Sequence, residues 1–135
     1  MDAGWRLSDA WVFAAIEGRN PDDGYALRQV IAKGDGIYHA VMTEPEFTTA
    51  VPRLINAGLI GCDLVADRYW HTAAGHDLYT RRMKRRGLFG WIHAIPPALD
   101  CLGPPQNGQW VLAPGVFERA VRQWQDRASE IPGTA

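Results

Sequence analysis

The stretch that decides the fold runs from Met42 to Tyr79 and reads M-T-E-P-E-F-T-T-A-V-P-R-L-I-N-A-G-L-I-G-C-D-L-V-A-D-R-Y-W-H-T-A-A-G-H-D-L-Y. Thr43 and Glu46 form a T-x-x-E capping box, a pattern that marks the first turn of a helix. Apolar residues then recur at helical spacing, and Gly58 suits the left-handed position that follows a helix. We therefore predict a helix between the capping box and Gly58.

The residues after this helix predict a β-hairpin that leads into a further helix. The apolar residues among 59–65 read as a first strand, 66–68 as a turn, and 69–71 as the return strand. Thr72 is placed to cap the helix that begins after it.

Two helices are predicted before this stretch. The first begins at Leu7 with Ser8 as its N-cap, and the second runs from about Tyr25 to Lys33 and ends at Gly34. Residues 34–43 then form a link that is longer than the 3–4-residue turn of a helix-turn-helix unit.

Helices are also predicted after the hairpin. The helix capped by Thr72 runs to about Arg86. Paired prolines in 87–113 predict that this apolar segment packs as short helical pieces rather than as one helix. A last helix spans about 114–128.

Two segments of the chain, E-F-T-T-A-V-P-R-L-I-N-A-G-L-I and R-Y-W-H-T-A-A-G-H-D-L, together resemble the core of winged helix-turn-helix proteins of the MarR-like and PadR-like group. The family pattern is a third helix ending in L-x-x-x-G-L-[IV], a β-wing, and T-x-x-G at the start of a fourth helix. The residues that match it are Leu54, Gly58, Leu59, Ile60, Thr72 and Gly75.

This resemblance implies an α+β, mostly α, fold: a winged helix-turn-helix with a two-stranded wing and additional C-terminal helices. We expect residues 1–135 to form a single domain, with a winged-helix core at 7–86 and a C-terminal helical extension at 87–135. The resemblance also implies a bacterial transcriptional regulator that binds double-stranded DNA as a homodimer.

Composition excludes several other classes of protein. The formal net charge is −1, so overall charge does not favour nucleic acid or membrane. Cys62 and Cys101 form no C-x-x-C pair, the histidines show no ligand spacing, and no nucleophile lies in a recognisable catalytic pattern. Since no signal peptide or membrane-spanning stretch is apparent, we expect a cytoplasmic protein without enzyme activity, metal or cofactor.

The third helix is the candidate recognition helix, with Thr48, Thr49, Arg53 and Asn56 on its predicted outward face and Arg68 at the wing. These side chains suit base edges and phosphates. Few of them are cationic, however, so the predicted DNA affinity of one subunit is weak. A second interpretation is therefore that the winged helix is a protein-interaction module or regulatory scaffold without specific DNA binding.

Two further surfaces are candidates for contact with a partner. A basic cluster at the end of the fourth helix either binds phosphates or an acidic partner, or is a solvated helix end. Its residues are Arg81, Arg82, Lys84, Arg85 and Arg86. An apolar stripe on the last helix, which includes Phe117, Val121 and Trp124, either forms the dimer interface or folds back on the core of its own chain.

Overall fold

The computed structural model describes residues 4–108 and 110–130, and among these the side chains outside 82–93 and 128–130. The described part contains the elements α1 (Leu7–Ala15), α2 (Leu27–Tyr38), α3 (Glu44–Asn56), β1 (Ile60–Asp63), β2 (Arg68–His71), α4 (Ala73–Asp100) and α5 (Val116–Glu130). The α+β, mostly helical class predicted from the sequence is confirmed.

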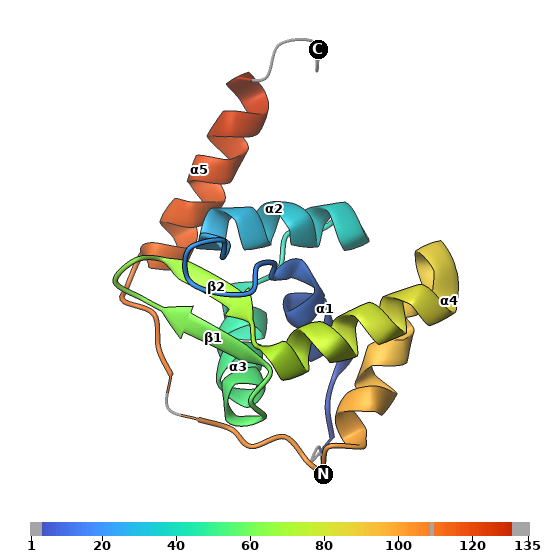
Figure 1. The fold of residues 1–135 in the computed structure, drawn as a ribbon. Helices are drawn as coiled ribbons and strands as arrows, with labels where there is room; N and C mark the ends of the chain where they lie inside the picture. Colours follow the sequence, from blue (N-terminus) through green and yellow to red (C-terminus); the bar gives the residue numbers. More distant parts are fainter. Residues whose placement is uncertain (1–3, 109, 131–135) are drawn as a thin grey trace.

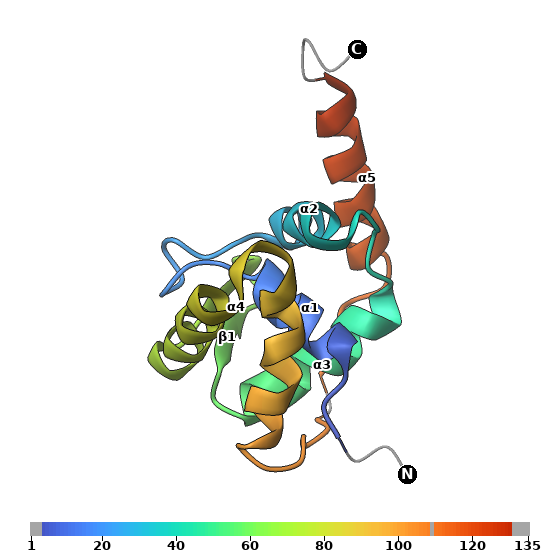
Figure 2. The same ribbon diagram turned by 90° about the vertical axis from the view of Figure 1, so that its right-hand side faces the viewer.

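Helix α1 is the centre of the molecule (Figures 1 and 2). It packs against α2, α3 and α4, and every side chain from Ala10 to Ile16 is buried. The predicted Ser8 cap is wrong. Instead, the carboxylate of Asp9 accepts a hydrogen bond from the backbone N–H of Arg6 at 2.9 Å, which caps the helix from its first turn.

Helix α2 is longer than predicted and passes through Gly34 to Tyr38. Gly34 does not end the helix because it serves packing: its carbonyl accepts a hydrogen bond from Trp11 Nε1 at 2.9 Å, and an added Cβ would lie 2.6 Å from Met42 Cε. His39, at φ 56°, ends the helix instead. The link between α2 and α3 is therefore the five residues 39–43, shorter than the ten predicted.

The capping box that opens α3 is confirmed, since the Thr43 hydroxyl accepts from Glu46 N and Thr43 N donates to the Glu46 carboxylate. Strands β1 and β2 pair antiparallel with Ile60 opposite His71. Tyr25 adds a single bridge to Tyr69 at the far edge of β2. This small sheet covers one end of α3 and places His71 toward the core.

The first strand ends earlier than predicted, because Leu64 and Val65 lie in the turn. The carboxylate of Asp63 accepts hydrogen bonds from Val65 N and Ala66 N, which closes the chain into a turn directly after β1. Asp67 follows at φ 57° and accepts from Leu27 N at 3.1 Å, so the turn is tied to the start of α2.

Helix α4 begins as predicted at Thr72, whose hydroxyl accepts from Gly75 N. The predicted break is wrong, since one helix continues through Pro96 and Pro97 to Asp100. It changes direction along its length, so that its second half returns toward α1 (Figures 1 and 2). The apolar burial of Ile95 and Leu99 favours this continuation despite the prolines. The predicted boundary at residue 87 therefore falls inside a helix.

The chain after α4 crosses the outer side of α3 in extended form and reaches α5 on the other side of the molecule (Figure 1). Helix α5 packs by its first turns on α2, and its far end projects from the body. Leu112, Phe117 and Ala120 bring this C-terminal part into the same core as α1.

Candidate functional site

Arg53, the predicted DNA-contacting cation of α3, is buried. Its Nη1 lies 3.0 Å from Asp9 Oδ2, and the two side chains are only 7% and 1% exposed. The expectation that Arg53 faces outward is therefore wrong. Helical spacing alone places Arg53 on the outward face of α3, but its ion pair with the carboxylate at the start of α1 holds it inward.

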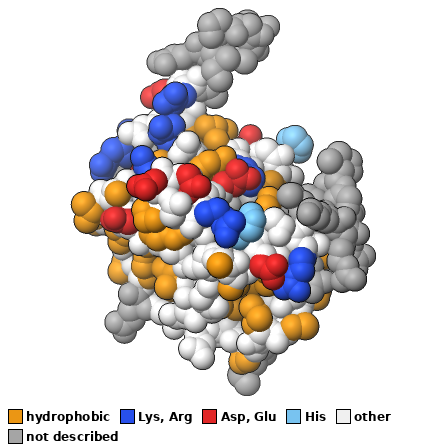
Figure 3. All heavy atoms as spheres, viewed as in Figure 1, with side chains coloured by type: hydrophobic (Ala, Val, Ile, Leu, Met, Phe, Trp, Pro, Cys, Tyr) orange, Lys and Arg blue, Asp and Glu red, His pale blue; other side chains and the backbone are white. Residues whose placement is uncertain are grey.

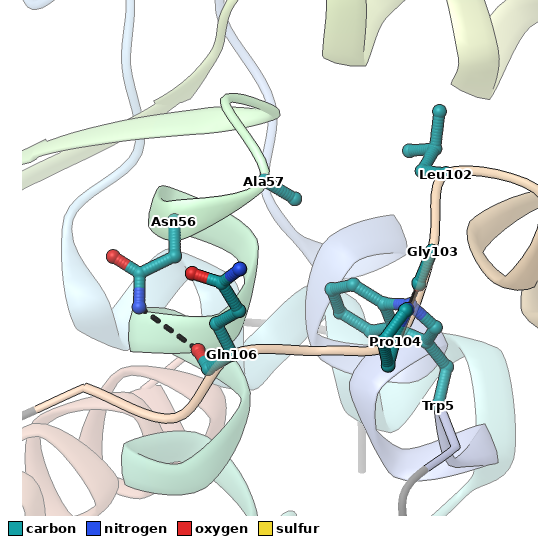
Figure 4. A pocket seen from close by; sticks show the side chains of 7 residues that line it. All are labelled: Trp5, Asn56, Ala57, Leu102, Gly103, Pro104 and Gln106. Atoms are coloured by element: carbon teal, nitrogen blue, oxygen red, sulfur yellow. Dashed lines mark hydrogen bonds between the residues drawn. The ribbon is translucent and has the colours of Figure 1, made fainter.

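Residues 103–108, called the strap below, cover the part of α3 on which Arg53 lies. Arg53 Nε donates to Asn107 Oδ1 at 2.8 Å, and Asn56 Nδ2 donates to the carbonyl of Gln106 at 2.8 Å (Figure 4). An added Cβ on Gly108 would lie 3.0 Å from Pro52 Cβ, so the glycine allows the strap to run against the helix. Pro52 is thus a buried contact between α3 and the strap.

The other two predicted contact residues of α3 lie toward its N-terminus. Thr49 is exposed, as predicted. Thr48 is half-buried, and its hydroxyl donates to the carbonyl of Glu44 at 2.9 Å. Asn56, at the end of α3, is also exposed, as predicted, although its amide is bonded to the strap. The surface of α3 that the strap leaves uncovered is its first two turns, where Glu44 and Glu46 are the charged residues.

The hairpin tip is apolar and acidic rather than basic. Arg68 Nη1 donates to the carbonyls of Ala66 and Asp67, so its guanidinium is held against its own turn. Val65 is 99% exposed and Leu64 is 48% exposed. Figure 3 shows hydrophobic side chains gathered over this hairpin, with Lys and Arg side chains farther up along α5.

The structure describes only the first side chain of the predicted basic cluster. Arg81 is exposed and forms an ion pair with Asp77 at 2.7 Å, one helical turn earlier. The side chains of Arg82, Lys84, Arg85 and Arg86 lie outside the described residues.

The predicted dimer stripe is divided between the core and the surface. Phe117 is buried, with its ring centroid 5.8 Å from that of Phe47. Val121 and Trp124 are half-buried and pack at the margin of the same core. At its first turn, the stripe therefore folds back on its own chain.

A cleft of about 360 Å³ lies on another side of the molecule, between the loop that follows α1, strand β2 and the start of α4. Its lining residues are Glu17, Gly18, Arg19, Asp23, His71, His76, Tyr79 and Thr80. Lys33 reaches into this region from α2, donating to Glu17 Oε1 at 2.6 Å and to the Tyr79 hydroxyl at 3.3 Å. The loop between α1 and α2, helix α2, strand β2 and helix α4 thus bring polar groups to one cleft.

His71 is the buried group of this cleft, at 2% exposed. Its Nε2 lies 2.8 Å from the carbonyl of Phe13, and its ring packs against the rings of Phe13 and Tyr79 at 4.6 and 5.2 Å. Burial lowers the pKa of His71 to about 4, against the opposing effect of the hydrogen bond to Phe13. The imidazole is therefore neutral at pH 7, with Nε2–H donating and Nδ1 carrying a lone pair.

Glu17 is the carboxylate closest to this network. Burial raises its pKa, but the hydrogen bond and charge of Lys33 and the hydrogen bond from Tyr25 outweigh burial, so the pKa is lowered. Glu17 is thus ionised at pH 7 and holds the Lys33 ammonium beside the cleft.

In the sequence the histidines show no ligand spacing, and no pattern predicts this cleft. Its members are separated by up to 63 positions, from Glu17 to Thr80, and no local motif joins them. The available signal was the alternation of β2, which places Tyr69 and His71 on one face of the strand and predicts that both are buried.

No family model, curated protein or solved structure matches the chain. Within residues 4–108 and 110–130, no helix has the length and apolar character needed to cross a bilayer. The same part of the chain holds no cluster of three or more His, Cys, Asp or Glu side chains placed to hold a metal ion.

Proposed function

We propose that this protein is a winged helix-turn-helix domain that works as a protein-interaction module. The order of its elements supports the winged-helix assignment: α2 and α3 are joined by five residues, a two-stranded hairpin follows, and a Thr72-capped helix comes next. A single bridge between Tyr25 and Tyr69 ties the hairpin to the segment that leads into α2.

The main observation that favours a protein partner over DNA is the Arg53–Asp9 ion pair. Affinity for duplex DNA depends on cations that neutralise phosphates. Arg53 is the only Lys or Arg in the sequence of α3, and it is buried, paired and covered by the strap. The open turns of α3 carry Glu44 and Glu46, which repel phosphate.

A second exposed surface, the tip of the hairpin, suits a protein partner. The hairpin tip exposes Leu64 and Val65 next to Asp63 and Asp67, while the Arg68 guanidinium is bound to its own turn. Exposed apolar side chains with a polar rim are typical of protein-protein contacts.

Site-specific crosslinking in the organism of origin tests this proposal. A photoreactive amino acid replaces Thr49 or Val65 in the full chain, and a third variant carries it at the exposed Gln123 of α5 as a control. We expect one protein to crosslink at both Thr49 and Val65 and not at Gln123. Crosslinks to nucleic acid at these two positions would overturn the proposal.

DNA binding, the function implied by the resemblance, is tested by fluorescence polarisation on random duplex DNA at low salt. We expect no saturable binding through α3 and the hairpin. Binding that Thr49→Ala and Arg68→Ala weaken together would instead favour a DNA-reading protein, because these are the predicted contact residues that the strap leaves uncovered.

A further inference from the structure

We propose that the pocket between the tip of the hairpin and the start of α5 receives one aliphatic side chain of a protein partner, and that Lys or Arg residues beside this side chain pair with the carboxylates of Asp63 and Asp67. This inference rests on the function proposed above, because it names the kind of partner segment that the hairpin surface recognises.

The pocket has a buried floor and an exposed rim. Its volume is about 160 Å³, and it lies where the hairpin meets the segment that leads into α5 (Figure 1). Tyr69 and Leu112 are buried in the lining, whereas Leu64 and Ala113 are exposed. A cavity of roughly 150 Å³ with aliphatic walls holds one benzene-sized group, so this pocket has room for a single leucine-sized side chain. The complete lining is Leu64, Asp67, Tyr69, Leu112, Ala113 and Val116.

Exposed apolar side chains lie next to two residues of this lining. Val65, which follows Leu64, is 99% exposed, and Val111, which precedes Leu112, is 76% exposed. Covering such side chains removes apolar surface from water and favours association. A side chain that fills a pocket at the centre of an apolar patch typically contributes a large share of the binding energy.

Two carboxylates at the tip favour a basic partner. Asp63 uses Oδ1 for the N–H groups of Val65 and Ala66, and Asp67 uses Oδ1 for the N–H of Leu27. Both residues are exposed, and no donor among the described residues bonds the second oxygen of either carboxylate. A Lys or Arg of the partner can therefore bond each carboxylate without breaking a contact of the hairpin.

The charges of the surrounding elements point the same way. Residues 4–76 contain nine Asp or Glu and six Lys or Arg, a net charge of −3 with the histidines taken as neutral. The two elements that form the pocket, residues 60–71 and 110–119, hold three acids and two bases, a net charge of −1. A basic segment is thus favoured over an acidic one. These five charged residues are Asp63, Asp67, Glu118, Arg68 and Arg119.

Three capped peptides of one length test the proposal: Gly-Lys-Leu-Lys-Gly, Gly-Lys-Ala-Lys-Gly and Gly-Glu-Leu-Glu-Gly. Each is titrated into the full chain at pH 7 and low salt and followed by methyl and amide NMR. We expect the lysine–leucine peptide to give saturable shifts at Leu64, Leu112 and Val116. The alanine peptide should bind at least about tenfold more weakly, because it lacks three apolar carbon atoms. The glutamate peptide should bind roughly fivefold more weakly, because its charges are repelled.

Substitutions separate the apolar and the charged parts of the site. Ala113→Leu fills the rim of the pocket and should weaken the lysine–leucine peptide by about tenfold or more. Asp63→Asn combined with Asp67→Asn should remove the preference for lysine over glutamate, and each amide oxygen can still accept the N–H groups of the turn. Gln123→Ala, exposed on α5, is the control and should leave the affinity unchanged. The amide spectrum checks that each variant is folded.

No saturable shifts with the lysine–leucine peptide would overturn the proposal, as would equal binding of the leucine and alanine peptides or of the lysine and glutamate peptides. Shifts at the pocket that grow with protein concentration in the absence of peptide would also overturn it, because a second copy of the chain would then be the occupant.

The crosslinking experiment distinguishes this inference from the proposed function. A protein captured at Val65 equally well with and without Ala113→Leu would overturn the inference and leave the proposed function standing. Nucleic acid captured at Val65 would remove the proposed function and this inference with it, because the occupant would then not be a protein.

Discussion

Arg53 of α3 and Asp9 of α1 form a buried ion pair, with 3.0 Å between Nη1 and Oδ2. The two residues are 44 positions apart in sequence, and Asn107 of the strap accepts a second hydrogen bond from Arg53. Because Asp9 also caps α1 through the N–H of Arg6, one carboxylate fixes the start of α1, the side of α3 and the path of the strap.

Removing one partner of this pair should be costly. Arg53→Ala leaves Asp9 charged and buried, and a broken buried pair typically costs about 3–5 kcal/mol. We expect a loss of that size in the free energy of unfolding, measured by urea denaturation. The matched control is Arg81→Ala, whose ion pair with Asp77 is 68% and 63% exposed and should contribute less than about 1 kcal/mol. Equal effects of the two substitutions would contradict a buried Arg53.

Two glycines of α2 should respond to alanine in opposite directions. Gly36 is exposed with nothing within 4 Å of an added Cβ, so Gly36→Ala should stabilise the helix by about 0.5–1 kcal/mol. At Gly34 the added Cβ would lie 2.6 Å from the buried Met42, so Gly34→Ala should destabilise the protein by about 1–3 kcal/mol. Thermal unfolding of both variants checks the prediction, and a stabilising Gly34→Ala would show that the terminal methyl of Met42 moves aside at little cost.

The free energy of unfolding should decrease as the pH is lowered, because His71 titrates. Burial lowers its folded pKa to about 4 from an ordinary 6.5, so the unfolded chain takes up a proton first as the pH falls. The contribution of the neutral His71 to the free energy of unfolding is complete above about pH 6.5. It is lost progressively down to about pH 4, by roughly 3 kcal/mol in all. Urea unfolding at pH 7, 6 and 5 measures this slope.

His71→Gln is the control for that slope, because an amide can still donate to the Phe13 carbonyl but does not titrate. The difference in unfolding free energy between the wild type and this variant should shrink as the pH falls toward 5. A difference that is independent of pH would show that His71 is not held neutral in the folded protein.

Local signals predicted the caps of α3 and α4 and the presence of the hairpin. The Thr43–Glu46 box and the Thr72 cap each lie within four residues of sequence, so the pattern and the structure describe the same hydrogen bonds. The resemblance placed Gly75 at the start of the fourth helix, and the structure shows its physical reason: an added Cβ would lie 1.9 Å from the carbonyl oxygen of Leu59.

The candidate sites could not be predicted in the same way, because they depend on distant partners. Helical spacing alone assigned Arg53 to the outward face, whereas its inward position is set by Asp9 and Asn107, 44 and 54 positions away. Glycine and proline patterns also failed at Gly34 and Pro96, where packing against the core overrides the local tendency to end a helix.

The homodimer predicted from the sequence stays a prediction. The structure shows which substitution on α5 can test it without disturbing the core. Phe117 is 4% exposed within its own chain, so Phe117→Ala should cost about 3–5 kcal/mol of folding stability whether or not a dimer forms. Trp124 is half-buried at the margin of the core, so part of its side chain is available to a second copy. Trp124→Ala is therefore the variant that reports on assembly.

Light scattering measures the outcome. At protein concentrations of tens of micromolar we expect the wild type to have twice the 15.0 kDa mass of one chain, and Trp124→Ala to shift toward a single chain. Gln123→Ala, exposed on the same helix, should leave the mass of the wild type unchanged. A wild type that scatters as one chain would refute the dimer and assign the whole stripe, Trp124 included, to the core of its own chain.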